Sequence, residues 1–186
     1  MNAGPLPRPG LRGLVDRVVG PGASRGELLL NIVPALAAAF AAPIYAAQIG
    51  VDWSAFAYVV AALLALDLVG GVATTASRSG RRWYHGPDHG AGRHLAFIVP
   101  HILHLVLVSW LFLDSDVLWV VVAGGYLLAA ALAVLAVPAD LRRPLAMLAY
   151  AGSLVLALFV LAAPLGLEWF LPIYYLKLLV SYLSGT

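Results

Sequence analysis

The sequence predicts an all-α integral membrane protein, in which six transmembrane helices form one bundle and both termini lie in the cytoplasm. Three observations lead to this prediction. Hydrophobic residues make up 62% and charged residues 11% of the 186-residue chain, whereas an ordinary soluble domain has about 25% charged residues. The apolar residues gather in six runs, each close to the ~20 residues that cross the hydrocarbon core as a helix. The arginines occur only in the N-terminal tail and in alternate connections between these runs.

Each apolar run is expected to form one helix. Residues 1–27 form a polar tail, and the six spans lie at about residues 28–48, 53–76, 94–113, 117–137, 144–165 and 169–183. Residues 28–186 are therefore expected to form a single transmembrane domain. Helices are favoured because they satisfy every backbone polar group within the segment. The connections are short, so consecutive helices should be antiparallel neighbours.

The tail contains one apolar stripe, formed by Leu11, Leu14, Val15 and Val18. These positions have the spacing of one face of a helix, which is typical of a short amphipathic helix lying on a membrane surface. A disordered cytoplasmic tail is the alternative interpretation. The stripe alone does not separate the two.

The charges predict the orientation of the bundle. The ten arginines lie in the tail, in residues 77–93 and at positions 142 and 143, while the alternate connections carry only the acidic residues Asp52, Asp114, Asp116 and Glu168. Cytoplasmic loops of membrane proteins carry the excess of basic residues. We therefore expect a multi-pass protein of the cell (cytoplasmic) membrane. The net charge of +2 is spread over short segments between apolar runs, so no nucleic-acid partner is expected.

One carboxylate, Asp67, lies well inside the second apolar run. A carboxylate there costs ~2.5–3.5 kcal/mol on insertion scales, so it needs a partner or must be neutral. At ~100° per residue, Asp67, Gly71, Thr74 and Arg78 share one helix face. They predict a polar stripe that runs to the cytoplasmic loop, with Gly71 leaving room beside the carboxylate.

The third run brings histidines to the same depth. His94, His101 and His104 share a helix face. His101 lies ~10 Å and His104 ~15 Å from the cytoplasmic start of this run, while Asp67 lies ~14 Å from the cytoplasmic end of its own run. The side chains should therefore meet. Lys177 in the last run is either the counter-charge of Asp67 or a snorkelling lysine.

The connection between the second and third runs forms a basic rim. Arg78, Arg81, Arg82 and Tyr84 predict an anion site for a substrate head group, because arginine forks match phosphate and carboxylate groups. The alternative is an ordinary interfacial belt of aromatic and basic residues.

Several chemistries fit this constellation. Asp67, His101 and His104 could act as acid and base, or hold zinc or iron, with His85, His89 and His94 as further ligands. Haem is disfavoured because the intramembrane histidines lie on one face of one helix. The chain has no cysteine, which excludes thiolate sites.

The leading hypothesis is an enzyme that acts on a lipid or other amphipathic substrate from the inner leaflet, with the lipid bilayer as its partner. In that hypothesis Arg78, Arg81, Arg82, Tyr84 and Lys177 bind the substrate. A proton- or ion-coupled transporter of small solutes is one alternative. The other is a non-catalytic protein in which the polar cluster only fixes helix packing. The oligomeric state stays open.

Overall fold

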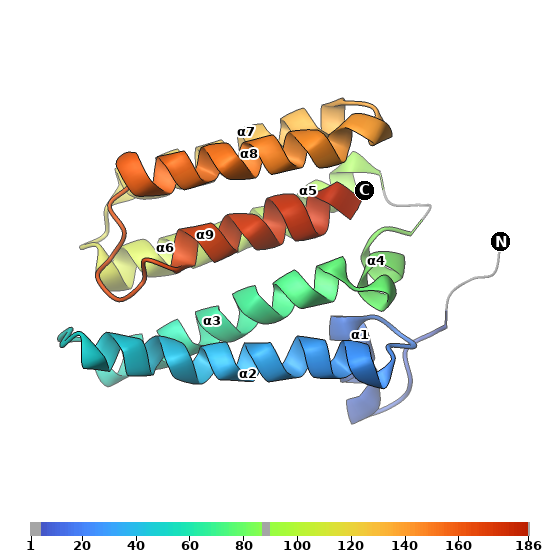
Figure 1. Ribbon diagram of the computed structural model, residues 1–186, viewed down its shortest axis with the longest axis horizontal. Helices are drawn as coiled ribbons and strands as arrows, with labels where there is room; N and C mark the ends of the chain where they lie inside the picture. The colour runs from blue at the N-terminus through green and yellow to red at the C-terminus, as the bar shows by residue number, and fades with distance from the viewer. Residues whose placement is uncertain (1–4, 87–89, 186) are drawn as a thin grey trace.

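The computed structural model describes residues 5–86 and 90–185, and every regular element in these residues is a helix (Figure 1). Most are α-helices, while η1 and η3 are 3-10 turns and η2 is a π-helical segment. In chain order they are α1 (Leu11–Val19), α2 (Arg25–Gln48), α3 (Ala55–Ala76), α4 (Arg78–Tyr84), α5 (Ala91–Ile98), η1 (Val99–His101), α6 (Ile102–Phe112), α7 (Val117–Ala136), α8 (Ala139–Phe159), α9 (Phe170–Tyr175), η2 (Leu176–Tyr182) and η3 (Leu183–Gly185).

Five segments in the described part of the chain are long and apolar enough to cross a membrane. They are α2, α3, the continuous run α5–η1–α6, α7 and α8. Large apolar side chains also cover the outside of the bundle, where Phe40, Leu148 and Phe159 are 68%, 69% and 80% exposed. Exposed apolar surface of this extent is typical of contact with lipid or protein. The fold is therefore consistent with a helical, multi-pass membrane protein.

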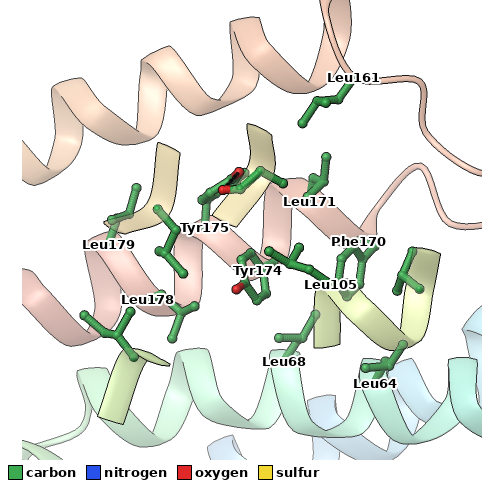
Figure 2. Packing of buried hydrophobic residues seen from close by; sticks show 14 of the residues in the cluster. Leu64, Leu68, Leu105, Leu161, Phe170, Leu171, Tyr174, Tyr175, Leu178 and Leu179 are labelled. Carbon is green, nitrogen blue, oxygen red and sulfur yellow. Dashed lines mark hydrogen bonds between the residues drawn. The ribbon is translucent and has the colours of Figure 1, made fainter. Parts of the chain in front are cut away.

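The last predicted span corresponds to α9, η2 and η3, which follow one another without a break. This C-terminal helix is shorter than each of the five segments above. It lies in the middle of the molecule, between α3 on one side and α7 and α8 on the other (Figure 1). Its side chains form much of the core, together with residues of α3 and α6 (Figure 2): Phe170, Tyr174, Tyr175, Leu178 and Leu179.

The polar stripe predicted from Asp67 to Arg78 is wrong at its Arg78 end. Helix α3 stops at Ala76, and Ser77 adopts an extended conformation. The Ser77 hydroxyl accepts a hydrogen bond from the Gly80 amide at 3.0 Å, which is the geometry of a helix N-cap. Arg78 therefore begins the separate helix α4 instead of continuing the face of α3 that carries Asp67.

Two other local features follow from single residues. Pro100 lacks an amide donor, and the third span changes from α-helix to the 3-10 turn η1 at this point. Helix α8 begins at Ala139, so Arg142 and Arg143 lie within its first turns, where the sequence had suggested a connecting turn.

Candidate functional site

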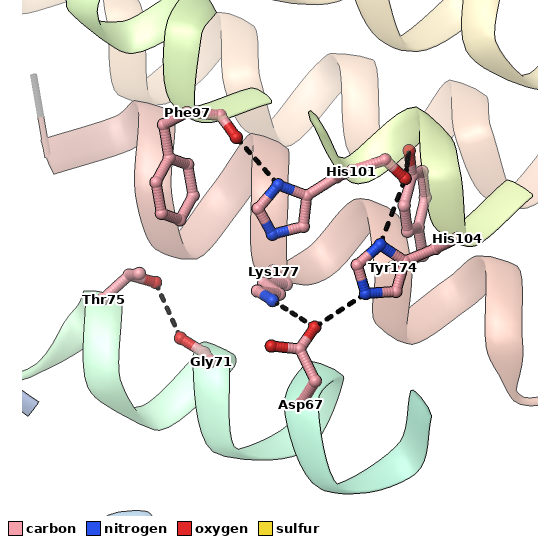
Figure 3. A network of polar contacts seen from close by, with 8 residues as sticks. All are labelled: Asp67, Gly71, Thr75, Phe97, His101, His104, Tyr174 and Lys177. Carbon is pink, nitrogen blue, oxygen red and sulfur yellow. Dashed lines mark hydrogen bonds and ion pairs between the residues drawn. The ribbon is translucent and has the colours of Figure 1, made fainter. Parts of the chain in front are cut away.

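Asp67 is the centre of a hydrogen-bonded network that joins three helices (Figure 3). The Lys177 ammonium of η2 donates to Asp67 Oδ2 at 2.6 Å. His104 Nε2 of α6 lies 3.0 Å from the same oxygen. The contact predicted between Asp67 and His104 is therefore present, and Lys177 is the counter-charge of Asp67. We call Asp67, His101, His104 and Lys177 the central network.

The sequence predicted that Gly71 leaves room beside the carboxylate, and Lys177 occupies this room. The Lys177 side chain is 2% exposed and lies directly over this glycine. A Cβ added to Gly71 would lie 2.8 Å from Lys177 Cδ and 3.0 Å from its Nζ. Lys177 also belongs to the π-helical segment η2, and π-turns are frequent at functional sites.

The hydrogen bonds of His101 define its tautomer. His101 Nδ1 lies 2.8 Å from the carbonyl oxygen of Phe97. A carbonyl oxygen only accepts, so Nδ1 must carry a proton and Nε2 of the neutral ring is an acceptor. In Figure 3 this second nitrogen points toward Lys177. The Tyr174 hydroxyl donates to the His101 carbonyl at 3.2 Å and helps to hold the segment.

The same reasoning gives the charge of the central network. His104 Nδ1 lies 3.2 Å from the His101 carbonyl oxygen and is therefore a donor. A second proton must then lie between His104 Nε2 and Asp67 Oδ2, whichever of the two atoms holds it. The histidine and the carboxylate are together neutral in either case. A protonated Lys177 therefore leaves the central network with one net positive charge.

A cavity of about 510 Å³ lies against this network. Asp67, His101 and Lys177 are on its wall. The rest of the wall combines apolar side chains of α1, α2 and α3 with Phe97, two glycines of α3 and a few polar side chains: Asn31, Thr74, Thr75 and Tyr84. Ile32 and Leu36 of α2 also belong to the wall and are each 46% exposed, so the cavity reaches the outer surface of the bundle. Its volume is in the ~300–1,000 Å³ range of small-molecule sites.

Asn31 adds an unusual polar group to this wall. Its residue is 4% exposed, yet neither atom of its side-chain amide has a hydrogen-bond partner among the described residues. Buried polar atoms are nearly always paired, and an unpaired one in a native protein needs an explanation. The sequence alone did not decide which way Asn31 faces.

A second group of histidines lies near α4. His94 Nδ1 is 3.0 Å from the Tyr182 hydroxyl, and His85 Nε2 is 2.9 Å from the Tyr182 carbonyl oxygen. We call His85, His94 and Tyr182 the α4-end cluster. His94 precedes His101 by about two helical turns, or ~10 Å, and so it does not join the central network. His89, a further predicted ligand, lies outside the described residues.

The geometry gives no support to the predicted metal site. Within residues 5–86 and 90–185, no three His, Cys, Asp or Glu side chains are grouped as metal ligands. His104 Nε2 and Asp67 Oδ2 are hydrogen-bonded to each other. A zinc or iron site of Asp67, His101 and His104 therefore stays a prediction, and haem stays the disfavoured alternative.

Only some of the predicted substrate-binding residues lie on the cavity wall. Tyr84 and Lys177 lie on the cavity wall, whereas Arg78, Arg81 and Arg82 do not. Arg81 instead lies near the end of the described chain, where a Cβ on Gly185 would be 3.2 Å from Arg81 Cδ. The division follows from the end of α3 at Ala76, because α4 carries the arginines past the cavity.

Sequence reasoning missed Tyr182 and the role of the Phe97 carbonyl. Face assignments at ~100° per residue fail in η2, because a π-helix has more residues per turn than an α-helix. Backbone carbonyls have no signature in a sequence.

Comparisons with models of protein families, with curated proteins and with solved structures found no match. The function must therefore be inferred from the chemistry of the site.

Proposed function

We propose that the protein is an enzyme that acts by acid/base chemistry on an amphipathic molecule with an anionic head group. One observation carries this proposal: His101, whose Nε2 is an acceptor, and Lys177, which carries an ammonium, both line one largely apolar cavity. Apolar walls suit an acyl chain or similar group, and the positive charge of the central network suits an anion.

Each residue of the site has a separate role. His101 Nε2 accepts a proton from a substrate hydroxyl or from a water molecule beside the substrate, while its Nδ1–H stays bonded to the Phe97 carbonyl. Lys177 stabilises the negative charge that develops on the substrate. Asp67 and His104 hold the ammonium in place. The proton on His101 then returns to the product, which restores the starting state.

The proposal includes six membrane crossings with both termini in the cytoplasm. The C-terminal helix lies along the bundle, and its end at η3 is at the same end of the bundle as α1 and α4 (Figure 1). The arginines at positions 8–25 and 78–93 are at this end too, and basic residues favour the cytoplasmic side. The substrate would then enter from the inner leaflet of the cell membrane.

The test uses the purified protein in vesicles of total lipid extract from the expression host, with lipids followed by mass spectrometry. Wild type should convert at least one anionic amphiphile. His101→Gln should reduce the rate by about 100-fold or more, since a general base contributes 10²–10⁴-fold. His94→Gln is the matched control and should retain most of the rate. No conversion by wild type, or equal rates in both variants, would overturn the proposal.

The metal-assisted form of this hypothesis has its own test. Elemental analysis of the same preparation should then find near-stoichiometric zinc or iron that is lost in His101→Ala and His104→Ala with folding retained. Protein that converts lipid without bound metal supports the metal-free form.

A purely structural role is the second candidate, because Asp67 links α3, α6 and η2 through two hydrogen bonds. In that case Asp67→Asn would lower the melting temperature in detergent, and no His101 variant would change any lipid. Loss of lipid conversion in His101→Gln at an unchanged melting temperature would exclude it.

A further inference from the structure

Helix α1 presents its apolar side outward. Leu11, Leu14 and Val18 are 81%, 57% and 61% exposed, and Val15 is 41% exposed. The buried side consists of Gly13, Asp16 and Val19. A helix on the surface of a soluble domain has the opposite arrangement, with its apolar stripe toward the core. The outward stripe therefore needs an apolar partner.

The rest of the structure fixes α1 so that this stripe cannot turn inward. The Tyr84 hydroxyl donates to the Val18 carbonyl at 2.9 Å, and the Ser79 hydroxyl donates to the Val19 carbonyl at 2.9 Å. Gly20, with a φ of +88°, lies so close to Ser79 that a Cβ would overlap the Ser79 backbone. The end of α1 is thus anchored to α4.

The charge of this segment is positive on its exposed side. Arg12 and Arg17 are exposed. Asp16, the one acidic residue of α1, is buried and paired with Arg8 through an Nη2–Oδ1 contact of 2.6 Å. Exposed arginines that flank an exposed apolar stripe are the combination found in helices bound to anionic membrane surfaces.

We propose that α1 docks in the head-group region of an anionic leaflet. Leu11, Leu14, Val15 and Val18 enter the boundary with the acyl chains, and Arg12 and Arg17 contact lipid phosphates. Val18 and Val19 also belong to the wall of the cavity. Docked in this way, α1 forms the rim of the cavity at head-group level. This inference goes beyond the acid/base proposal and does not depend on it.

The absence of cysteine from the chain allows a direct test with single-cysteine spin labels. Each variant is placed in nanodiscs that hold one copy, made of phosphatidylcholine with or without phosphatidylglycerol. Labels at positions 11, 14, 15 and 18 should be accessible to oxygen dissolved in the bilayer. Labels at positions 12 and 17 should be accessible to a water-soluble relaxation agent instead.

The role of the arginines is tested with Arg12→Gln and Arg17→Gln. Each should reduce the docked population in anionic nanodiscs by about fivefold, the effect expected of one basic residue near such a surface. Asn2→Gln, in the same tail, is the neutral control. Equal water accessibility at all labelled positions would overturn the proposal. Protection that occurs only when two copies share a nanodisc would also overturn it, because the partner would then be a second copy.

Discussion

The central network and the α4-end cluster contain the same kind of residue and differ in what they can do. In each, two imidazole rings are stacked. The ring centroids of His101 and His104 are 5.2 Å apart with an interplanar angle of 10°. Those of His85 and His94 are 5.4 Å apart with an interplanar angle of 26°. In the central pair, His104 is hydrogen-bonded to Asp67, which also binds Lys177, and His101 lines the cavity. The other pair bonds to a tyrosine hydroxyl and a backbone carbonyl.

The two histidine pairs therefore differ in their position relative to the cavity. Contact with Asp67 and access to the cavity make the central pair a candidate acid/base site. His85 and His94 are not on the cavity wall, and their contacts tie α4 and α5 to the C-terminal helix. Three predictions can break or sharpen this comparison, and a fourth concerns the separate Arg8–Asp16 pair.

The largest effect is expected for Asp67→Ala. It leaves the Lys177 ammonium, which is 2% exposed, without its carboxylate, while the Asp67 side chain itself is 46% exposed. The cost comes from the lysine, because a buried charge left uncompensated costs about 3–5 kcal/mol. The measurement is the free energy of unfolding in mixed detergent micelles. Asp67→Asn combined with Lys177→Met should recover most of the loss, since no buried charge remains. A loss of unfolding free energy no greater than that caused by His94→Gln would mean that the central network stabilises the fold no more than the α4-end cluster does.

Gly71→Ala is expected to have the next largest effect. Its methyl group would overlap Lys177, and overpacking of this kind costs about 1–3 kcal/mol. Gly125→Ala in α7 is the matched control, because a Cβ there meets nothing within 4 Å. The control should be neutral or slightly stabilising in the same unfolding assay. Equal behaviour of the two variants would show that Lys177 does not lie over Gly71.

Tyr182→Phe tests the α4-end cluster. The change removes the hydrogen bond to His94 but keeps the ring that stacks on Phe97 at 4.0 Å. A loss of ~1 kcal/mol in unfolding free energy is expected, with lipid conversion unchanged. A large loss of conversion in this variant, at unchanged stability, would place the α4-end cluster within the functional site.

The smallest effect concerns pH and the Arg8–Asp16 pair. Hydrogen bonds from Arg8 lower the pKa of Asp16 from 3.8 to about 2. A lowered pKa means that the ionised carboxylate stabilises the fold, fully above pH 3.8 and progressively less as the pH falls through about 2. A spin label at position 15 should gain mobility over this window. Asp16→Asn should remove the pH dependence of the label's mobility. If the variant showed the same pH dependence as wild type, a group other than Asp16 would be responsible.

Much of the fold and part of the site could be predicted from the sequence. Five of the six apolar runs correspond to the five long segments, because hydropathy and length are properties of a single helix. The contact between Asp67 and His104 followed from the helical rise of two antiparallel neighbours. The room beside Gly71 followed from the helix face that it shares with Asp67.

Other features depend on how several helices meet. The break at Ser77 moved the arginines away from the cavity, and a capping hydroxyl leaves only a weak signal among other serines. The π-helical segment η2 placed Tyr182 beside His94, which no regular α-helical periodicity predicts.

The sequence by itself determined the long apolar helices and how far along their helices Asp67, His101 and His104 lie. These properties depend on local composition and on the rise of one helix. Only the tertiary structure decided which of the two roles Lys177 takes, which nitrogen of His101 is free to accept a proton and where the cavity lies. Each of these depends on distances between atoms from different helices, and such distances are set by packing.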